Sequence, residues 1–341
     1  MLLALVLALG FTSLVVLAAG AQPIVAYWEI LSGAFGSTRT IANVLVAWSP
    51  LLLTTAGLLV TFSAGLWNIG IEGQVILGAI FTTGALRMLQ DSSLPPALII
   101  VIAIAAGAIG GSLWGGLAGA LKTFGGVNEI FGGLGLNFVA TALVLWLVFG
   151  TWKRPGIGSM SGTQPFDESL WLPQLAGLRL SPWSLAIALV SMLLVYRLLT
   201  GTHFGLRLKA VGKNPRAAFL SGIPTSGYMM ASFLICGGFA GLAGALQVTG
   251  VYHRLIPAIS SGYGFLGLLV GMLVNYQALI AIPVSLFFAA INIGSVQLPL
   301  SLKVDSTLAG VLQGALVLFF LMMEGARQRW FDREGRSNGD V

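Results

Sequence analysis

The chain has 341 residues, of which 57% are hydrophobic and only 8% are charged, and its formal net charge is +6. A soluble domain is about a quarter charged, and a soluble chain this apolar would expose patches that aggregate. The composition therefore excludes a water-soluble protein, and because the basic residues are scattered between apolar runs rather than gathered on one face, it also argues against nucleic acid as a partner.

Apolar runs long enough to cross a bilayer as helices recur along the whole chain. We therefore expect an all-α integral membrane protein, in contact with the lipid bilayer, with about ten transmembrane helices, some of them broken or short. The expected spans are approximately 2–20, 43–62, 66–87, 95–121, 129–151, 182–200, 226–249, 262–275, 277–297 and 304–323. The first span could instead be a secretory signal, but it lacks a basic start. The 46 glycines, some spaced every four residues as in Gly107, Gly111, Gly115 and Gly119, predict close packing between helices.

The loop over 201–225 contains four basic residues and no acid, and the tail over 326–341 contains four arginines. The positive-inside rule places both on the cytoplasmic side, together with the N-terminus. Residues 1–325 are expected to form a single transmembrane domain. Loops 22–42 and 152–181 then lie outside; the first is expected to contain an interfacial helix, and the second is long enough to make a functional contact.

The stretch LWNIGIEGQVILGA at 66–79 places Asn68, Glu72 and Gln74 within an apolar region. Asn68 and Glu72 are four residues apart, so on a helix they would share a face and could hydrogen-bond. Glu129 and Asn137 lie eight residues apart in another span, on a side that glycine keeps open. Three interpretations remain: these groups hold a helix broken at its glycines together, line a path for a polar solute, or belong to an ion relay. A relay normally needs more titratable groups than the spans contain.

The loop GTHFGLRLKAVGKNPRAAFLSGIPT at 201–225 predicts a short helix, with Asn214 as its cap, Pro215 at its start and Gly222 closing it. Such a helix could lie on anionic lipid as a basic anchor, or it could fit a groove in a soluble partner. The small residues around it favour docking on a partner. The residues expected to carry this contact are Gly205, Arg207, Gly212, Asn214, Pro215, Ala217, Ala218 and Gly222.

Sites for chemistry are not expected in this chain. One cysteine and two separated histidines suggest neither a disulfide framework nor a metal site. The stretch GGLAGALKT at 115–123 has Leu121 before Lys122, where a phosphate-binding loop needs glycine. We therefore expect no catalytic residue, no bound cofactor and no ATP site, so that any energy from ATP must come from a separate subunit.

Three segments together resemble a known family: NIGIEGQ at 68–74, GVNEIFGGLGLNFVA at 126–140 and THFGLRLKAVGKNPRAAFLSGI at 202–223. CGGFAGLAGA at 236–245 and GYGF at 262–265 add to the resemblance. Over nearly its whole length, the chain resembles the permease subunit of a bacterial ABC importer, in the family that carries simple sugars, nucleosides and branched-chain amino acids. The first two segments resemble the nucleoside branch. The run FGGLG at 131–135 and Leu266 depart from that branch, so a simple sugar remains an alternative solute.

The resemblance implies a type II ABC importer-like bundle in the bacterial inner membrane, with residues 1–325 as the permease domain. It implies that loop 201–225 docks on a cytoplasmic ABC ATPase subunit, which hydrolyses ATP. It further implies a second permease subunit, identical or homologous, and an extracytoplasmic substrate-binding protein docking near loops 22–42 and 152–181. Asn68, Glu72, Gln74, Glu129, Asn137 and Phe265 become candidates for the solute path. An ion-coupled secondary transporter, which would work alone, is the alternative from another class.

Overall fold

The computed structural model describes residues 2–154, 162–303, 305 and 307–337, and within these ranges the chain forms helices and connecting turns without a strand. The α-helices are α1 (Leu2–Ala18), α2 (Pro23–Phe35), α3 (Thr38–Ser63), α4 (Ile71–Leu89), α5 (Pro96–Thr123), α6 (Glu129–Phe149), α7 (Pro182–Gly201), α8 (His203–Lys213), α9 (Pro215–Leu220), α10 (Thr225–Leu246), α11 (Tyr263–Leu273), α12 (Ala278–Gly294), α13 (Leu298–Ser301) and α14 (Leu308–Ser337). Short 3-10 turns are η1 (Glu168–Leu170) and η3 (Ser295–Gln297), and a π-helix, η2 (Gln247–Tyr252), extends α10. The sequence explains several helix starts, because α2, α5, α7 and α9 each begin with proline, which fits the first helical position.

The chain divides into two compact units, of which the smaller combines Met1–Val44 with Phe287–Val341. In this unit α1 packs along α14, and the rings of Phe11 and Phe319 meet edge to face with their centroids 6.0 Å apart. The Gln313 amide donates a hydrogen bond of 3.0 Å to the Phe288 carbonyl. These contacts join the two ends of the chain within one unit.

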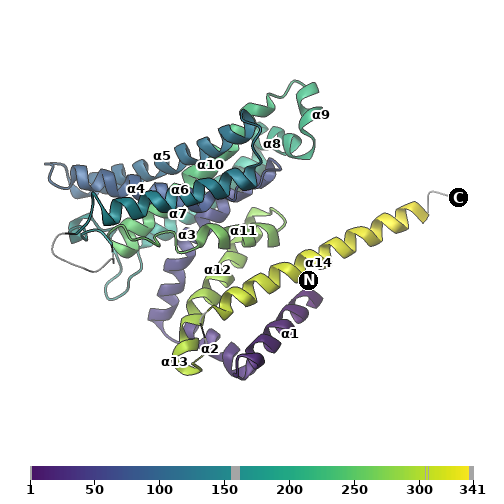
Figure 1. Ribbon diagram of the computed structural model, residues 1–341, viewed down its shortest axis with the longest axis horizontal. Helices are drawn as coiled ribbons and strands as arrows, with labels where there is room; N and C mark the ends of the chain where they lie inside the picture. Colours follow the sequence, from purple (N-terminus) through teal and green to yellow (C-terminus); the bar gives the residue numbers. More distant parts are fainter. Residues whose placement is uncertain (1, 155–161, 304, 306, 338–341) are drawn as a thin grey trace. The chain divides into compact units, whose positions relative to one another are not determined.

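The larger unit is Leu45–Leu286, and in it α4, α5, α6 and α10 lie side by side (Figure 1). The glycine face predicted at 107–119 lies against α10: a Cβ added at Gly111 would collide with the backbone of Gly237 and Gly241, and one at Gly115 would collide with that of Phe233. The packing function predicted for these glycines is confirmed. Close approach of this kind is possible only without side chains.

Replacing Gly111 by Ala should therefore lower the free energy of unfolding by about 1–3 kcal/mol, because overpacking displaces backbone. The measurement is thermal unfolding of the purified protein in detergent. Gly135→Ala is the matched control, since a Cβ at Gly135 meets no atom within 4 Å. Equal unfolding temperatures for the two variants would contradict the assigned contact.

The count of about ten spans is not confirmed. Among the described residues, six helices are long and apolar enough to cross a membrane. The total becomes seven if α1 and α2, bent by 105° at their junction, form one broken span. The run expected to cross at 262–275 contains only the 11 residues of α11, which extend about 16 Å against a hydrocarbon core of about 30 Å. The expectation of an all-helical membrane protein is correct.

The two loops expected outside the membrane and the C-terminal tail agree with the structure only in part. The helix expected in loop 22–42 is present as α2, with Trp28 exposed. Helix α14 continues past residue 325, where the transmembrane domain was expected to end, into the expected tail at 326–341. Part of loop 152–181, residues 155–161, lies outside the described residues. The single domain expected over residues 1–325 stays a prediction.

The two ends of the larger unit carry different segments. Helices α8 and α9 extend from one end of α5 and α10 (Figure 1). At the other end, the amide nitrogens of Thr163 and Leu172 donate to the carbonyls of Leu255 and Thr249. The segments predicted to face the two sides of the membrane, loops 201–225 and 152–181, therefore lie at opposite ends of this unit.

Candidate functional site

The helix interruption predicted within the stretch at 66–79 lies between α3 and α4, over residues 64–70, which we call the break. Gly65 has a φ of +71°, which glycine adopts without strain. The Leu66 amide donates back to the Thr61 carbonyl, so α3 ends in a closed turn. The break is thus a defined structure rather than a loosened helix.

Two buried amide side chains join the break to α4. Asn68 Nδ2 donates to Gln74 Oε1 and Gln74 Nε2 donates to Asn68 Oδ1, both at 3.0 Å. Asn68 Nδ2 also lies 3.0 Å from the Cys236 sulfur of α10. Asn68 is 1% exposed and Gln74 is 0% exposed. The expected hydrogen bond between Asn68 and Glu72 is wrong, because residue 68 is not helical and the four-residue spacing does not place the two side chains together.

Asn137 of α6 spans the break from the other side. Its Oδ1 accepts the Gly73 amide at 2.8 Å, and its Nδ2 donates to the Ile69 carbonyl at 2.9 Å. A Cβ added at Gly133 would lie 2.6 Å from the Gly70 nitrogen. The glycine side of α6, expected to stay open, is therefore filled by the backbone of the break.

Glu72 holds a distant part of the chain. Its Oε1 accepts the Gly262 amide at 3.1 Å and its Oε2 accepts the Gly264 amide at 2.9 Å. The Thr54 hydroxyl of α3 donates to the Tyr263 carbonyl at 2.9 Å. The first turn of α11 is thus held by side chains from α3 and α4, and Glu72 satisfies amides that the start of a helix leaves free.

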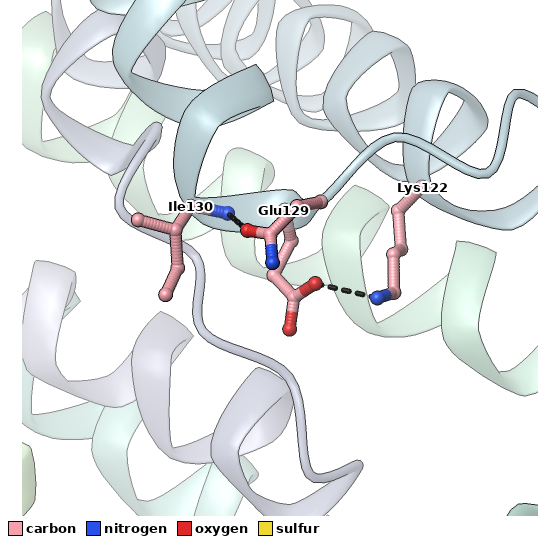
Figure 2. Close-up of polar contacts among 4 residues, drawn as sticks. Lys122, Glu129 and Ile130 are labelled. Carbon is pink, nitrogen blue, oxygen red and sulfur yellow. Dashed lines mark hydrogen bonds and ion pairs between the residues drawn. The ribbon is translucent and has the colours of Figure 1, made fainter.

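Glu129 does not take part in the hydrogen bonds at the break or at the start of α11. Figure 2 shows Glu129, at the start of α6, pointing toward Lys122 near the end of α5, with 2.6 Å between Glu129 Oε2 and Lys122 Nζ. Asn128 caps α6 by accepting the Ile130 amide at 2.9 Å. Phe265, one residue beyond Gly264, is 44% exposed. Six residues were candidates for the solute path. Three of them meet at the break: Asn68, Gln74 and Asn137. Glu72 binds the backbone at the start of α11, Glu129 pairs with Lys122, and Phe265 is exposed.

The Asn68–Gln74 pair gives a direct test of this arrangement. Asn68→Leu should lower the free energy of unfolding by about 1–3 kcal/mol, because it leaves the buried Gln74 amide without its partner. Adding Gln74→Leu should then cost less than the sum of the single changes. Thermal unfolding of the four proteins of this cycle measures the coupling; additive effects would contradict the pair.

The short helix predicted in loop 201–225 is confirmed as α9. The Asn214 side chain accepts the Ala217 amide at 3.0 Å, Pro215 is the first helical residue, and Gly222 follows with a φ of +80°. Ala217 is exposed, whereas Ala218 is only 5% exposed. The two alanines, both predicted to carry the contact, therefore differ: Ala217 faces outward, and Ala218 faces the packed side of α9.

The preceding helix α8 was not predicted from the sequence. It is capped by Thr202, whose hydroxyl accepts the Gly205 amide at 3.1 Å, and Arg207 on it is exposed. A Cβ at Gly205 would lie 2.7 Å from Leu199 Cα in α7, and one at Gly212 would lie 2.9 Å from the Gly65 nitrogen. Gly212 thus brings α8 into backbone contact with the break.

At the opposite end, His253 connects loop 152–181 to the end of α10. Its ring stacks on Trp171 with the centroids 3.7 Å apart. His253 Nδ1 lies 3.2 Å from the Thr249 carbonyl, and Nε2 lies 3.3 Å from Gln174 Nε2. A neutral imidazole fits both partners, as donor at Nδ1 and acceptor at Nε2. Burial lowers the pKa of His253; the bond to Thr249 raises it in part, and the positive charge of Arg179 lowers it further.

Acid should therefore loosen this attachment. Because the pKa of His253 is lower in the folded protein than its ordinary value, its contribution to stability is complete above about pH 6.5 and is lost as the pH falls below that value. Limited proteolysis of the loop at pH 8 and pH 5.5 measures the effect. His253→Phe keeps a ring on Trp171 but cannot titrate, and its pH dependence should be smaller; equal pH dependence in both proteins would contradict the assignment.

Comparison with known proteins supplies the family. The branched-chain amino acid transport system / permease component family matches residues 40–321. The chain is 31% identical to the glucose ABC transporter permease protein TsgB13 of Haloferax volcanii, over 96% of this chain and 89% of that protein. It is 25% identical to the guanosine ABC transporter permease protein NupP of Bacillus subtilis, over 93% of this chain and 91% of that protein. It is 26% identical to the nucleoside ABC transporter permease protein NupB of Lactococcus lactis, over 85% of this chain and 80% of that protein.

The family match, over residues 40–321, includes the break, α6, the α8–α9 loop and α11, which contain segments on which the resemblance in the sequence depends. The chain belongs to the branched-chain amino acid transport system / permease component family.

Proposed function

We propose that this chain is the permease subunit of an ATP-driven importer and that it forms the path for a nucleoside or a related small polar solute. The observation that carries the proposal is the α8–α9 segment. It is capped at both helix starts and extends from one end of α5 and α10, and Phe219 (67% exposed) and Leu220 (86% exposed) project from it. Exposed apolar side chains mark an interaction surface, and the small residues around them favour docking into a groove of a soluble partner.

The partners follow from this function. A cytoplasmic ABC ATPase subunit would bind α8–α9 and hydrolyse ATP, while this chain binds no cofactor of its own. A second permease subunit would complete the path, and an extracytoplasmic substrate-binding protein would dock near loops 22–42 and 152–181. The protein would lie in the bacterial cell membrane with both termini in the cytoplasm, as the basic residues of loop 201–225 favour.

The solute class rests on the relatives. Two of the relatives compared above are guanosine and nucleoside permeases, and the segment NIGIEGQ at 68–74 points to the same branch. A simple sugar is the second candidate, because the relative with 31% identity is a glucose permease. Both solutes carry a hydroxylated sugar ring.

Ion coupling has less support. A carboxylate that moves protons or sodium must be able to release its partners during transport. Glu72 is bound by two backbone amides, and Glu129 is paired with Lys122. Both acids are thus committed to holding the structure.

The test is transport by the reconstituted complex. Proteoliposomes containing the permease, its ATPase subunit and the binding protein should take up labelled guanosine only with ATP, and unlabelled nucleosides should compete. Competition by glucose alone would favour the sugar. Uptake by the permease chain without ATP, driven by an ion gradient, would overturn the proposal.

A further inference from the structure

The polar residues expected to line the path are buried and bonded to one another, so the solute must meet other side chains. Asn68, Gln74 and Asn137 are each at most 8% exposed, and each has partners within the chain. Glu72, also 8% exposed, uses both carboxylate oxygens on backbone amides. A path for a hydroxylated solute needs polar atoms that remain exposed.

Such atoms occur along the irregular segment 253–262, between α10 and α11. At its start, the His253 carbonyl accepts the Phe166 amide of loop 152–181. At its finish, Gly262 donates to Glu72, in the first turn of α4. Between them, Ile259 belongs to the same buried cluster as Ile76 and Ile80 of α4. The segment therefore runs alongside α4 from the loop end of the unit to the level of Glu72, within the depth of the spans.

Irregular backbone at this depth has a physical consequence. Within the hydrocarbon core it is tolerated only where it is buried in protein or lines a water-filled cavity. Leu255, Ile259 and Ser260 are buried, but Ala258 and Ser261 are exposed. One edge of the segment is thus covered by the chain itself, and the other edge requires water or a partner subunit.

The exposed edge has an unusual composition for a surface facing lipid. The Tyr252 hydroxyl and the Ser261 hydroxyl lie 3.2 Å apart, in an exposed contact. Ser261 has a φ of +50°, a conformation that is uncommon outside glycine and that collects at functional sites. A Cβ added at Gly262 would meet no atom within 4 Å, so the space beside it is open. Phe265 follows with 44% of its surface exposed.

We propose that Tyr252, Ser261 and Phe265 line the water-filled solute path and bind the hydroxylated ring of the solute. This inference rests on the proposed function and names the surface that carries it. The two hydroxyl groups can each donate and accept hydrogen bonds, which suits the hydroxyls of a sugar. The face of the Phe265 ring can stack on a flat base or on the apolar face of a sugar ring.

Glu72 and Thr54 then act as positioning residues. They fix the first turn of α11 through the Gly262 and Gly264 amides and the Tyr263 carbonyl, and Phe265 follows directly. None of the three proposed contact residues carries a charge, so the surface does not suit the zwitterionic group of an amino acid. The chemical class is a neutral, hydroxylated ring solute.

The chain allows a sharp test by thiol labelling, because its one cysteine, Cys236, is buried. Ser261→Cys is close to isosteric and keeps a side chain that differs by one atom, and Phe265→Cys samples the neighbouring turn. Val190→Cys is the matched control: Val190 is 54% exposed, but on the regular helix α7. The complete transporter, with ATPase and binding protein, is treated in membrane vesicles with a polar thiol reagent that does not cross lipid.

Ser261→Cys, the conservative variant, should react and lose its remaining uptake on labelling. Phe265→Cys should also react, but its uptake should already be reduced before labelling because the stacking ring is gone. Val190→Cys should stay unlabelled. During ATP-driven turnover, guanosine should protect Ser261→Cys, with glucose and leucine as comparison solutes. Protection of Ser261→Cys by glucose but not by guanosine would support the proposed surface and identify a sugar as the solute. Failure of Ser261→Cys to react, with guanosine uptake intact, would overturn this inference alone; labelling that leaves uptake unchanged would overturn it as well. If Ser261→Cys reacted but the wild-type transporter took up neither guanosine nor glucose, the accessibility of this edge to water would stand and the proposed function would be contradicted.

Discussion

Replacing Leu220 by Asp should abolish ATP-driven uptake while leaving the amount of protein in the membrane unchanged. Leu220 is the last residue of α9 and is 86% exposed, so the change disturbs no internal packing. In an apolar docking contact, a carboxylate would lose its water without gaining a partner. Loss of a central contact residue typically weakens binding by 2 kcal/mol or more, or roughly 30-fold.

Co-purification of the ATPase subunit with the permease measures this directly, together with uptake. Leu175→Asp is the matched control, because Leu175 is also an exposed leucine but lies in loop 152–181, at the opposite end of the unit. That variant should retain its ATPase subunit. If Leu220→Asp retained it too, and transported normally, α9 would not be the docking element.

A charge placed at the buried Ala218 of α9 would test something different from a charge at the exposed Leu220. A charge at Ala218, which is 5% exposed, would have to enter the packing between α9 and the rest of the loop. Loss of transport by such a variant would report misfolding of the loop. The informative substitutions are therefore those at Ala217, Phe219 and Leu220.

Glu72→Gln should reduce both stability and uptake. The carboxylate accepts amides from Gly262 and Gly264, one on each oxygen, whereas a glutamine has only one accepting oxygen. One buried amide would then lack a partner, at a cost of about 1–3 kcal/mol. The first turn of α11 would loosen, and Phe265 with it.

Thermal unfolding and uptake kinetics together separate the two interpretations of Glu72. A positioning role predicts a lower unfolding temperature, with the order of preference among competing solutes retained. Glu129→Gln is the comparison variant, because Glu129 lies away from α11 and a glutamine there can still accept a hydrogen bond from Lys122. A Glu72→Gln protein with unchanged stability but altered solute preference would show that Glu72 touches the solute.

Local signals in the sequence predicted the elements of the site well. Asn214 and Pro215 define the start of α9 because capping and proline geometry depend only on neighbouring residues. The interruption near Gly65 and Gly70 could be expected because glycine removes the barrier to leaving the helix. The glycine face of α5 likewise predicted its packing.

Partners far away in the chain could not be predicted. The amides that Glu72 binds are 190 and 192 residues away, and the sulfur near Asn68 is 168 residues away. The hydrogen bond predicted between Asn68 and Glu72 assumed that residues 68–72 are helical. Helix α4 begins only at Ile71, so the four-residue spacing does not bring the two side chains together. Ser261 gave no sequence signal, because its exposure and its positive φ arise only from how 253–262 crosses the unit. The count of about ten spans also stays unconfirmed, since hydropathy alone does not distinguish a short apolar helix such as α11 from one that crosses the bilayer.

Uptake of labelled guanosine by the host, before and after deletion of the gene, tests the central claim most directly. The account predicts that deletion abolishes uptake, that the wild-type chain restores it, and that the Leu220→Asp chain, present in the membrane at the same level, does not. Unchanged uptake in a strain without a second nucleoside system would contradict the nucleoside assignment, and full restoration by the Leu220→Asp chain would contradict energy supply through α9.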